Sequence, residues 1–116
     1  MTEGIDNLGA QQCSDLPADD LVLDQKDIIH LGQDLNPPWQ FNAEENSISY
    51  TYSFKNYYQT MAFVNVIAQV AHQQDHHPEL TVSYNRCTVS YTTHSVGGLS
   101  KKDFICAAKI NAAQNL

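Results

Sequence analysis

The stretch from Glu79 to Tyr91, ELTVSYNRCTVSY, contains two short runs in which apolar and polar residues alternate. Alternation with a period of two is typical of β-strands that bury one face. The pair Asn85-Arg86 interrupts the alternation, so we expect a tight turn or bulge there. The stretch therefore predicts two antiparallel strands joined as a hairpin.

Upstream of this hairpin, the sequence contains a second pair of expected strands. Ile48, Tyr50 and Tyr52 alternate with serine and threonine, which indicates a strand with one apolar face. A shorter strand is expected from Trp39, with residues 42–46 as the loop between the two. The two pairs together predict a four-stranded antiparallel sheet.

Three further segments have apolar residues at helical spacing. The first begins after Asp24, a favourable N-cap, and stops before the prolines at positions 37 and 38, because proline cannot continue a helix. The second covers residues 55–74 and is the longest. The third is capped by Ser100, with Asp103 at its third position, and runs to about residue 113.

The order of elements is helix, two strands, helix, two strands, helix. This order (α-β-β-α-β-β-α) predicts an α+β fold in which three helices pack on one face of the sheet. Two rows of apolar residues in the longest helix are expected to form its core face. The rows are Phe54, Tyr58, Ala62, Val66 and Val70, and beside them Phe63, Ile67 and Ala71.

The length of 116 residues favours a single domain, expected at residues 21–116 after a flexible lead-in at residues 1–20. The net charge is −7 with only six lysines and arginines, which speaks against nucleic acid or an anionic membrane as partner. No apolar run approaches the roughly 20 residues of a membrane span. The first ten residues also lack a signal-peptide pattern, so a cytoplasmic protein is expected. Three cysteines without paired spacing indicate free thiols.

Histidines supply the candidate chemistry, because imidazole can donate or accept a proton near neutral pH. Four of the five lie close together in the sequence, at positions 72, 76, 77 and 94. His72 and His76 would share a helix face if the helix extended that far. The expected hairpin brings His94 towards the His76-His77 corner. His30 lies apart and is expected to be an ordinary surface residue.

Metal binding is the alternative chemistry for these histidines, because two imidazoles four apart on a helix can hold zinc or copper. The chain has no glutamate in an HExxH arrangement. Adjacent histidines also point in different directions and are poorly placed to bind one ion together. We therefore expect no metal site.

The spacing of this segment resembles the signature of the pterin-4a-carbinolamine dehydratase family, also known as the dimerization cofactor of a homeodomain transcription factor. The resemblance extends over about residues 21–113. Its motif positions are His72, His76, His77, Pro78, Tyr84, His94 and Asp103. Two departures are His72, where many members have glutamate, and Leu80, where tryptophan is common.

The resemblance implies a function as well as the α+β fold. Members of the family dehydrate 4a-hydroxytetrahydrobiopterin to quinonoid dihydropterin, which recycles the cofactor of aromatic amino acid hydroxylases. They need no metal or organic cofactor and form homodimers or homotetramers. His76, His77 and His94 take the catalytic positions. The implied substrate-binding residues are His72, Asp75, His76, His77, Thr92, Thr93, His94 and Ser95.

Elimination of water from the pterin needs one acid and one base. We hypothesise that His76 and His94 supply them, while His77 binds and orients the pterin. Two other functions stay open at this stage. One is a non-catalytic dimeric coactivator that binds a protein partner, and the other is a pterin-related protein with a different substrate.

Overall fold

The computed structural model describes residues 8–16 and 22–114 of the chain. In this part of the chain, four strands form one antiparallel sheet in the order β1-β2-β4-β3. The strands are β1 (Gln40–Asn42), β2 (Ser47–Ser53), β3 (Glu79–Val82) and β4 (Arg86–Tyr91). The hairpin between β3 and β4 turns at Tyr84 and Asn85, and Arg86 already belongs to β4 rather than to the predicted turn.

The central pair of strands explains why the sheet has one apolar and one polar face. β2 and β4 pair in a register that places Tyr52 beside Cys87 and Ile48 beside Tyr91, all four of which are buried. Tyr50 and Val89 pair between them on the same face, and the alternate pairs are serines and threonines that point to the opposite face. The alternation seen in the sequence is therefore the alternation of the sheet.

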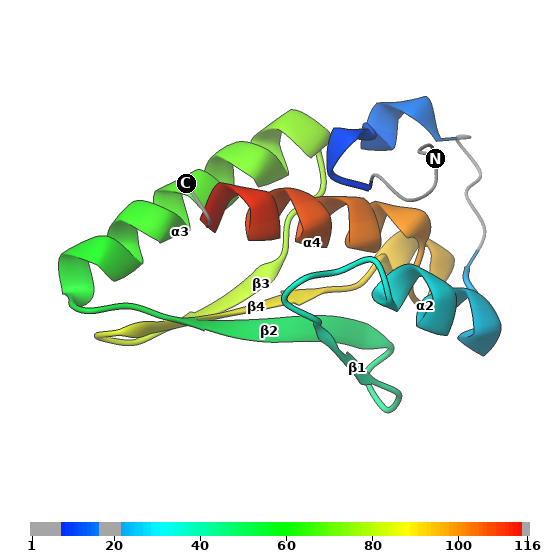
Figure 1. The fold of residues 1–116 in the computed structure, drawn as a ribbon. Helices are drawn as coiled ribbons and strands as arrows, with labels where there is room; N and C mark the ends of the chain where they lie inside the picture. Colours follow the sequence, from blue (N-terminus) through cyan, green and yellow to red (C-terminus); the bar gives the residue numbers. More distant parts are fainter. Residues whose placement is uncertain (1–7, 17–21, 115–116) are drawn as a thin grey trace.

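The described helices are α2 (Gln25–Gly32), α3 (Tyr57–Gln74) and α4 (Lys101–Gln114). Figure 1 shows α3 and α4 lying over one face of the sheet, with α2 beside the N-terminal half of α4. The predicted α+β fold with a four-stranded antiparallel sheet and three helices is confirmed. Within the described residues, no helix is both long enough and apolar enough to cross a membrane.

Side-chain caps place the helix starts. The Asp24 carboxylate accepts a hydrogen bond from the Asp27 N–H at 2.9 Å, as the sequence predicts. Asn56 caps α3 in the same way through the Gln59 N–H, so this helix begins at Tyr57, two residues later than expected. Both caps satisfy backbone donors that a helix leaves unpaired in its first turn.

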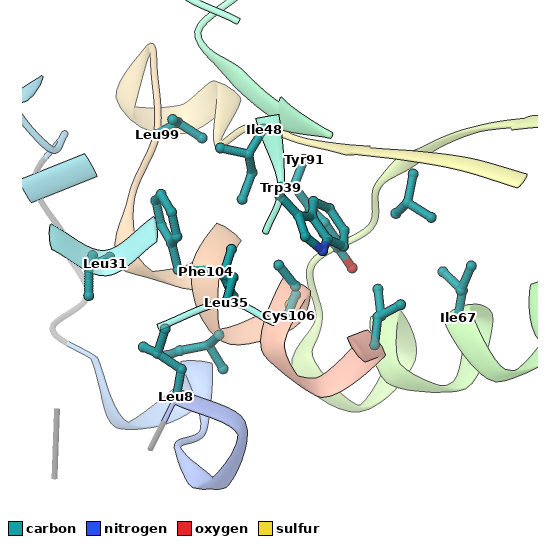
Figure 2. Packing of buried hydrophobic residues seen from close by; sticks show 14 of the residues in the cluster. Leu8, Leu31, Leu35, Trp39, Ile48, Ile67, Tyr91, Leu99, Phe104 and Cys106 are labelled. Atoms are coloured by element: carbon teal, nitrogen blue, oxygen red, sulfur yellow. The ribbon is translucent and has the colours of Figure 1, made fainter. Parts of the chain in front are cut away.

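The core lies between α4 and the sheet (Figure 2). Phe104, Ile105, Cys106 and Ile110 of α4 are all at most 1 % exposed, and Tyr91 and Trp39 approach them from the sheet side. Trp39 also donates its indole N–H to Asn111 at 3.0 Å, which satisfies the polar edge of a buried ring. The three cysteines, Cys13, Cys87 and Cys106, are free and buried, as expected for thiols.

The predicted core face of α3 is only partly correct. Phe63 and Ile67 are buried, but Tyr58 is 81 % exposed and Ala62 and Val66 are exposed as well. Residues four apart are offset by about 40° around a helix with 3.6 residues per turn. A row of such residues therefore winds around the helix: Tyr58, Ala62 and Val66 face outward, whereas Val70 at the end of the row packs against the core.

Part of the expected lead-in, residues 8–16, has defined structure. Two short 3₁₀ turns, η1 (Leu8–Ala10) and η2 (Cys13–Asp15), pack against α4. Leu8 and Cys13 of these turns are buried and belong to the hydrophobic core. The rest of the predicted lead-in, at positions 1–7 and 17–20, lies outside the described residues.

Candidate active site

The C-terminal end of α3 places the His76-His77 pair. Asp75 has the left-handed conformation, with φ 52° and ψ 46°. The His76 N–H donates to the Ala71 carbonyl at 3.0 Å and the Asp75 N–H donates to His72. This is a Schellman motif, which ends the helix. His76 therefore lies beyond the helix, and it does not share a helical face with His72.

His76 is held on two sides. Its ring Nε2–H donates to Asp103 Oδ1 at 2.6 Å, and its ring stacks on Tyr91 with 5.0 Å between centroids. Only 13 % of the side chain is exposed. The imidazole is thus fixed in orientation before any ligand binds.

Asp103 is fully buried, and its second oxygen is also an acceptor. Oδ2 accepts from the Thr93 hydroxyl at 2.8 Å and from the Ser100 N–H at 2.9 Å. Ser100 in turn accepts from the Lys102 N–H, which completes the capping box predicted at the start of α4. The Asp103 carboxylate only accepts hydrogen bonds, so the His76 ring nitrogen that faces it, Nε2, must carry the proton. The other ring nitrogen, Nδ1, is then free to accept a proton.

Tyr91 supports the same corner from β4. Burial raises the pKa of its hydroxyl, so the group stays protonated. The hydroxyl donates to the His76 carbonyl at 3.0 Å. One tyrosine thus contacts both the ring and the backbone of His76.

The segment after β4 carries the remaining predicted residues. Thr93 is buried and pairs with Gly98 through the backbone, and η3 (His94–Val96) lies between them. Gly97 closes the turn with φ 73°, a conformation that favours glycine. His94 and Ser95 are consequently presented at the surface.

A cavity of about 230 Å³ lies between these two corners. Seven of the eight predicted site residues line it, and Lys102 is an eighth lining residue that the sequence did not indicate. His72 is exposed and absent from the lining. The predicted residues in the lining are Asp75, His76, His77, Thr92, Thr93, His94 and Ser95.

A second recess, of about 270 Å³, adjoins the first one. His77, Thr92 and His94 line both, so these three residues form the common wall. The second recess adds the carboxylates of Glu45 and Glu79 together with serine hydroxyls of β2 and β4. A ligand in the first cavity would therefore lie next to a polar recess that is lined by two carboxylates.

Two residues that support the site were missed as site residues. The sequence indicated Asp103 only as a helix cap and a motif position. Its place in the motif, among the histidines, was the signal that could have indicated a role at the site. No sequence pattern indicated Lys102. It lines the cavity only because the start of α4 lies close to the loop that carries His94. Among the described residues, no three histidine, cysteine or acidic side chains gather in a way that could hold a metal ion.

Together these features define an α+β domain with a histidine-lined polar cavity at one end of the sheet. The chain belongs to the pterin 4 alpha carbinolamine dehydratase family, whose family model matches residues 22–113. The segment at residues 8–16 precedes this match.

Relatives and a solved structure agree with this assignment. A Nitrosospira multiformis protein is 49% identical over 96% of both chains, and a Nitrosomonas eutropha protein is 56% identical over 77% of both. Both carry the provisional name pterin-4-alpha-carbinolamine dehydratase. A Brucella melitensis crystal structure, described as a transcriptional coactivator/pterin dehydratase, has 31% identity and a TM-score of 0.74. It covers 78% of this chain and 96% of its own.

Proposed function

We propose that this chain dehydrates 4a-hydroxytetrahydrobiopterin, or a close analogue, to the quinonoid dihydropterin and water. The observation that carries the proposal is the cavity, which His76, His77 and His94 all line. Family membership supplies the substrate class, and two imidazoles beside one cavity supply the acid and the base that the reaction needs.

The reaction breaks the C4a–O bond and removes a proton from the ring nitrogen next to C4a. In the proposal, His76 Nδ1 accepts this proton, because Asp103 behind the ring stabilises the imidazolium that forms. His94 gives a proton to the departing hydroxyl, which leaves as water. His94 is exposed, so it can exchange protons with solvent and be ready for the next turnover.

The remaining lining residues bind the substrate in this proposal. His77 lies in the wall between the two recesses and orients the pterin ring. Lys102 offers a cationic N–H donor to a ring carbonyl. The second recess, with its carboxylates and hydroxyls, accepts a hydroxylated side chain of the pterin.

The test follows the dehydration of chemically generated 4a-hydroxytetrahydropterin by ultraviolet absorbance. Wild type is compared with His76→Ala, each with and without EDTA. We expect wild type to accelerate the reaction, EDTA to change nothing, and the variant to lose most of the acceleration. A wild-type rate equal to the spontaneous rate would contradict the proposal, and loss of the rate with EDTA would show a metal-dependent reaction instead.

A second candidate function is the binding of a protein partner. It is favoured by the exposed apolar side chains of Tyr57, Tyr58 and Val66 on α3, and the description of the Brucella protein names a coactivator. The simplest partner is a second copy of this chain in a homodimer or homotetramer. Sedimentation of wild type and Tyr58→Glu tests this idea: we expect an oligomer that the charge weakens, whereas a monomeric wild type would contradict it.

A further inference from the structure

Residues 8–16 form a strap across the top of the helical layer. Figure 1 shows this segment in blue above α4, next to the C-terminal end of α3. Leu8 is buried against α4, and Lys109 of α4 donates from Nζ to the Gly9 carbonyl at 2.8 Å. The strap is therefore anchored to α4 by apolar burial and by a charge-assisted hydrogen bond.

The strap also forms hydrogen bonds with Gln74, the last residue of α3. The Cys13 N–H donates to Gln74 Oε1 at 2.8 Å, and Gln74 Nε2 donates to Gln12 Oε1 at 2.8 Å. Gln74 is only 8 % exposed. A buried amide needs partners for both its donor and its acceptor, and the strap supplies them.

The same turn of the strap contacts α4 beside the histidine site. The Cys13 thiol lies 3.8 Å from the Lys102 carbonyl and 3.9 Å from Cys106 Sγ. Lys102 immediately precedes Asp103, the partner of His76. On the other side, Gln74 immediately precedes Asp75, the left-handed residue that leads to His76. The strap thus bridges the two segments that the His76–Asp103 hydrogen bond joins.

We infer that Gln74 is a positioning residue, which through Gln12 and Cys13 of the strap keeps His76 aligned with Asp103. Asp75 alone connects Gln74 to His76, so a shift at the end of α3 moves the imidazole directly. The strap precedes the residues that the family model matches. The kinetic consequence rests on the proposed dehydratase function, whereas the alignment of His76 does not.

The deciding variant is Gln74→Leu, which keeps the size of the side chain and removes both hydrogen bonds. Gln73→Leu, at the exposed neighbouring position, is the matched control. The first readout is hydrogen exchange of the His76 Nε2–H proton, measured by NMR. The second is the split between kcat and KM for pterin dehydration. For Gln74→Leu we expect faster exchange and a kcat lower by on the order of 10-fold, with KM little changed.

Two further variants separate positioning from general destabilisation. Gln74→Glu keeps the acceptor for Cys13, and the Gln12 amide can turn over to donate to the new carboxylate, so exchange and kcat should return towards wild type. Gln12→Ala changes an exposed side chain and removes one bond only, so it should give an intermediate effect even if Gln74→Leu does not fold.

The inference is overturned if Gln74→Leu folds and matches Gln73→Leu in both readouts. If Gln74→Leu does not fold, unchanged exchange of the His76 proton in Gln12→Ala overturns it instead. If wild type shows no dehydratase activity, the proposed function fails, and the exchange measurement still decides the role of the strap.

Discussion

The two sides of the histidine cavity are built differently. On the inner side, His76 is 13 % exposed and held by Asp103 and by the Tyr91 ring. On the outer side, His77 and His94 are exposed, and neither side chain has a hydrogen-bond partner among the residues that the structure describes. One side is held in a fixed geometry, as the proposed proton transfer requires, and the other side lacks such restraints.

The largest expected effect falls on the inner side. His76→Ala should lower kcat/KM for pterin dehydration by about 10²-fold to 10⁴-fold, the usual contribution of a positioned acid or base. The rate of dehydration by stopped-flow absorbance measures it, and thermal unfolding checks that the variant is folded. An effect no larger than that of an exposed substitution such as Gln73→Ala would remove the distinction between the two sides.

The next largest effect is expected from a substitution of Asp103, the hydrogen-bond partner of His76. Asn at position 103 has one acceptor oxygen, whereas Asp103 accepts on both oxygens from three donors. Asp103→Asn should therefore reduce kcat by on the order of 10²-fold, because His76 loses its fixed tautomer. It should also lower the free energy of unfolding by about 1–3 kcal/mol, because a buried donor is left unpaired.

These two losses are measured by kinetics and by chemical denaturation. Ser83→Ala, at an exposed position on the β3–β4 hairpin, serves as the control for both. Full activity in Asp103→Asn would mean that the carboxylate is only a helix cap.

A smaller effect is expected on the outer side. His77→Ala should raise KM by about 10-fold, as expected for the loss of one or two hydrogen bonds to a ligand, and leave kcat nearly unchanged. Steady-state kinetics over a range of pterin concentration separates the two constants. A loss confined to kcat would instead make His77 part of the proton-transfer chemistry.

The smallest effect concerns His72, the predicted substrate-binding residue that the structure leaves outside the cavity lining. His72 is exposed on the last turn of α3. His72→Ala should leave both kcat and KM within about twofold of wild type, as is usual for surface substitutions. A marked rise in KM in the same assay would support the substrate contact that the family resemblance implies.

Local patterns were sufficient to predict most of the fold. Alternation in β2 and β4 and the caps at Asp24 and Ser100 depend on neighbouring residues, and the structure confirms them. The exposure of Tyr58, Ala62 and Val66 was not predictable, because two apolar rows around a helix do not show which of them the sheet covers.

The site was predictable only in part, for a similar reason. The family resemblance grouped residues that lie together in the structure, because seven of the eight predicted site residues line one cavity. The second role of Asp103, the place of Lys102 and the strap at residues 8–16 all depend on contacts between elements far apart in the sequence. In particular, nothing near Gln74 in the sequence indicates that Gln12 and Cys13 are its partners.

The most direct test of the account is a double-variant cycle on His76 and His94. Dehydration rates are measured for wild type, His76→Ala, His94→Ala and the double variant under identical conditions. If the two imidazoles act as one acid–base pair, each single variant loses most of the acceleration and the double variant loses little more. A double variant that loses the product of the two single effects, or a single variant with the wild-type rate, would contradict the pairing of the inner and outer sides.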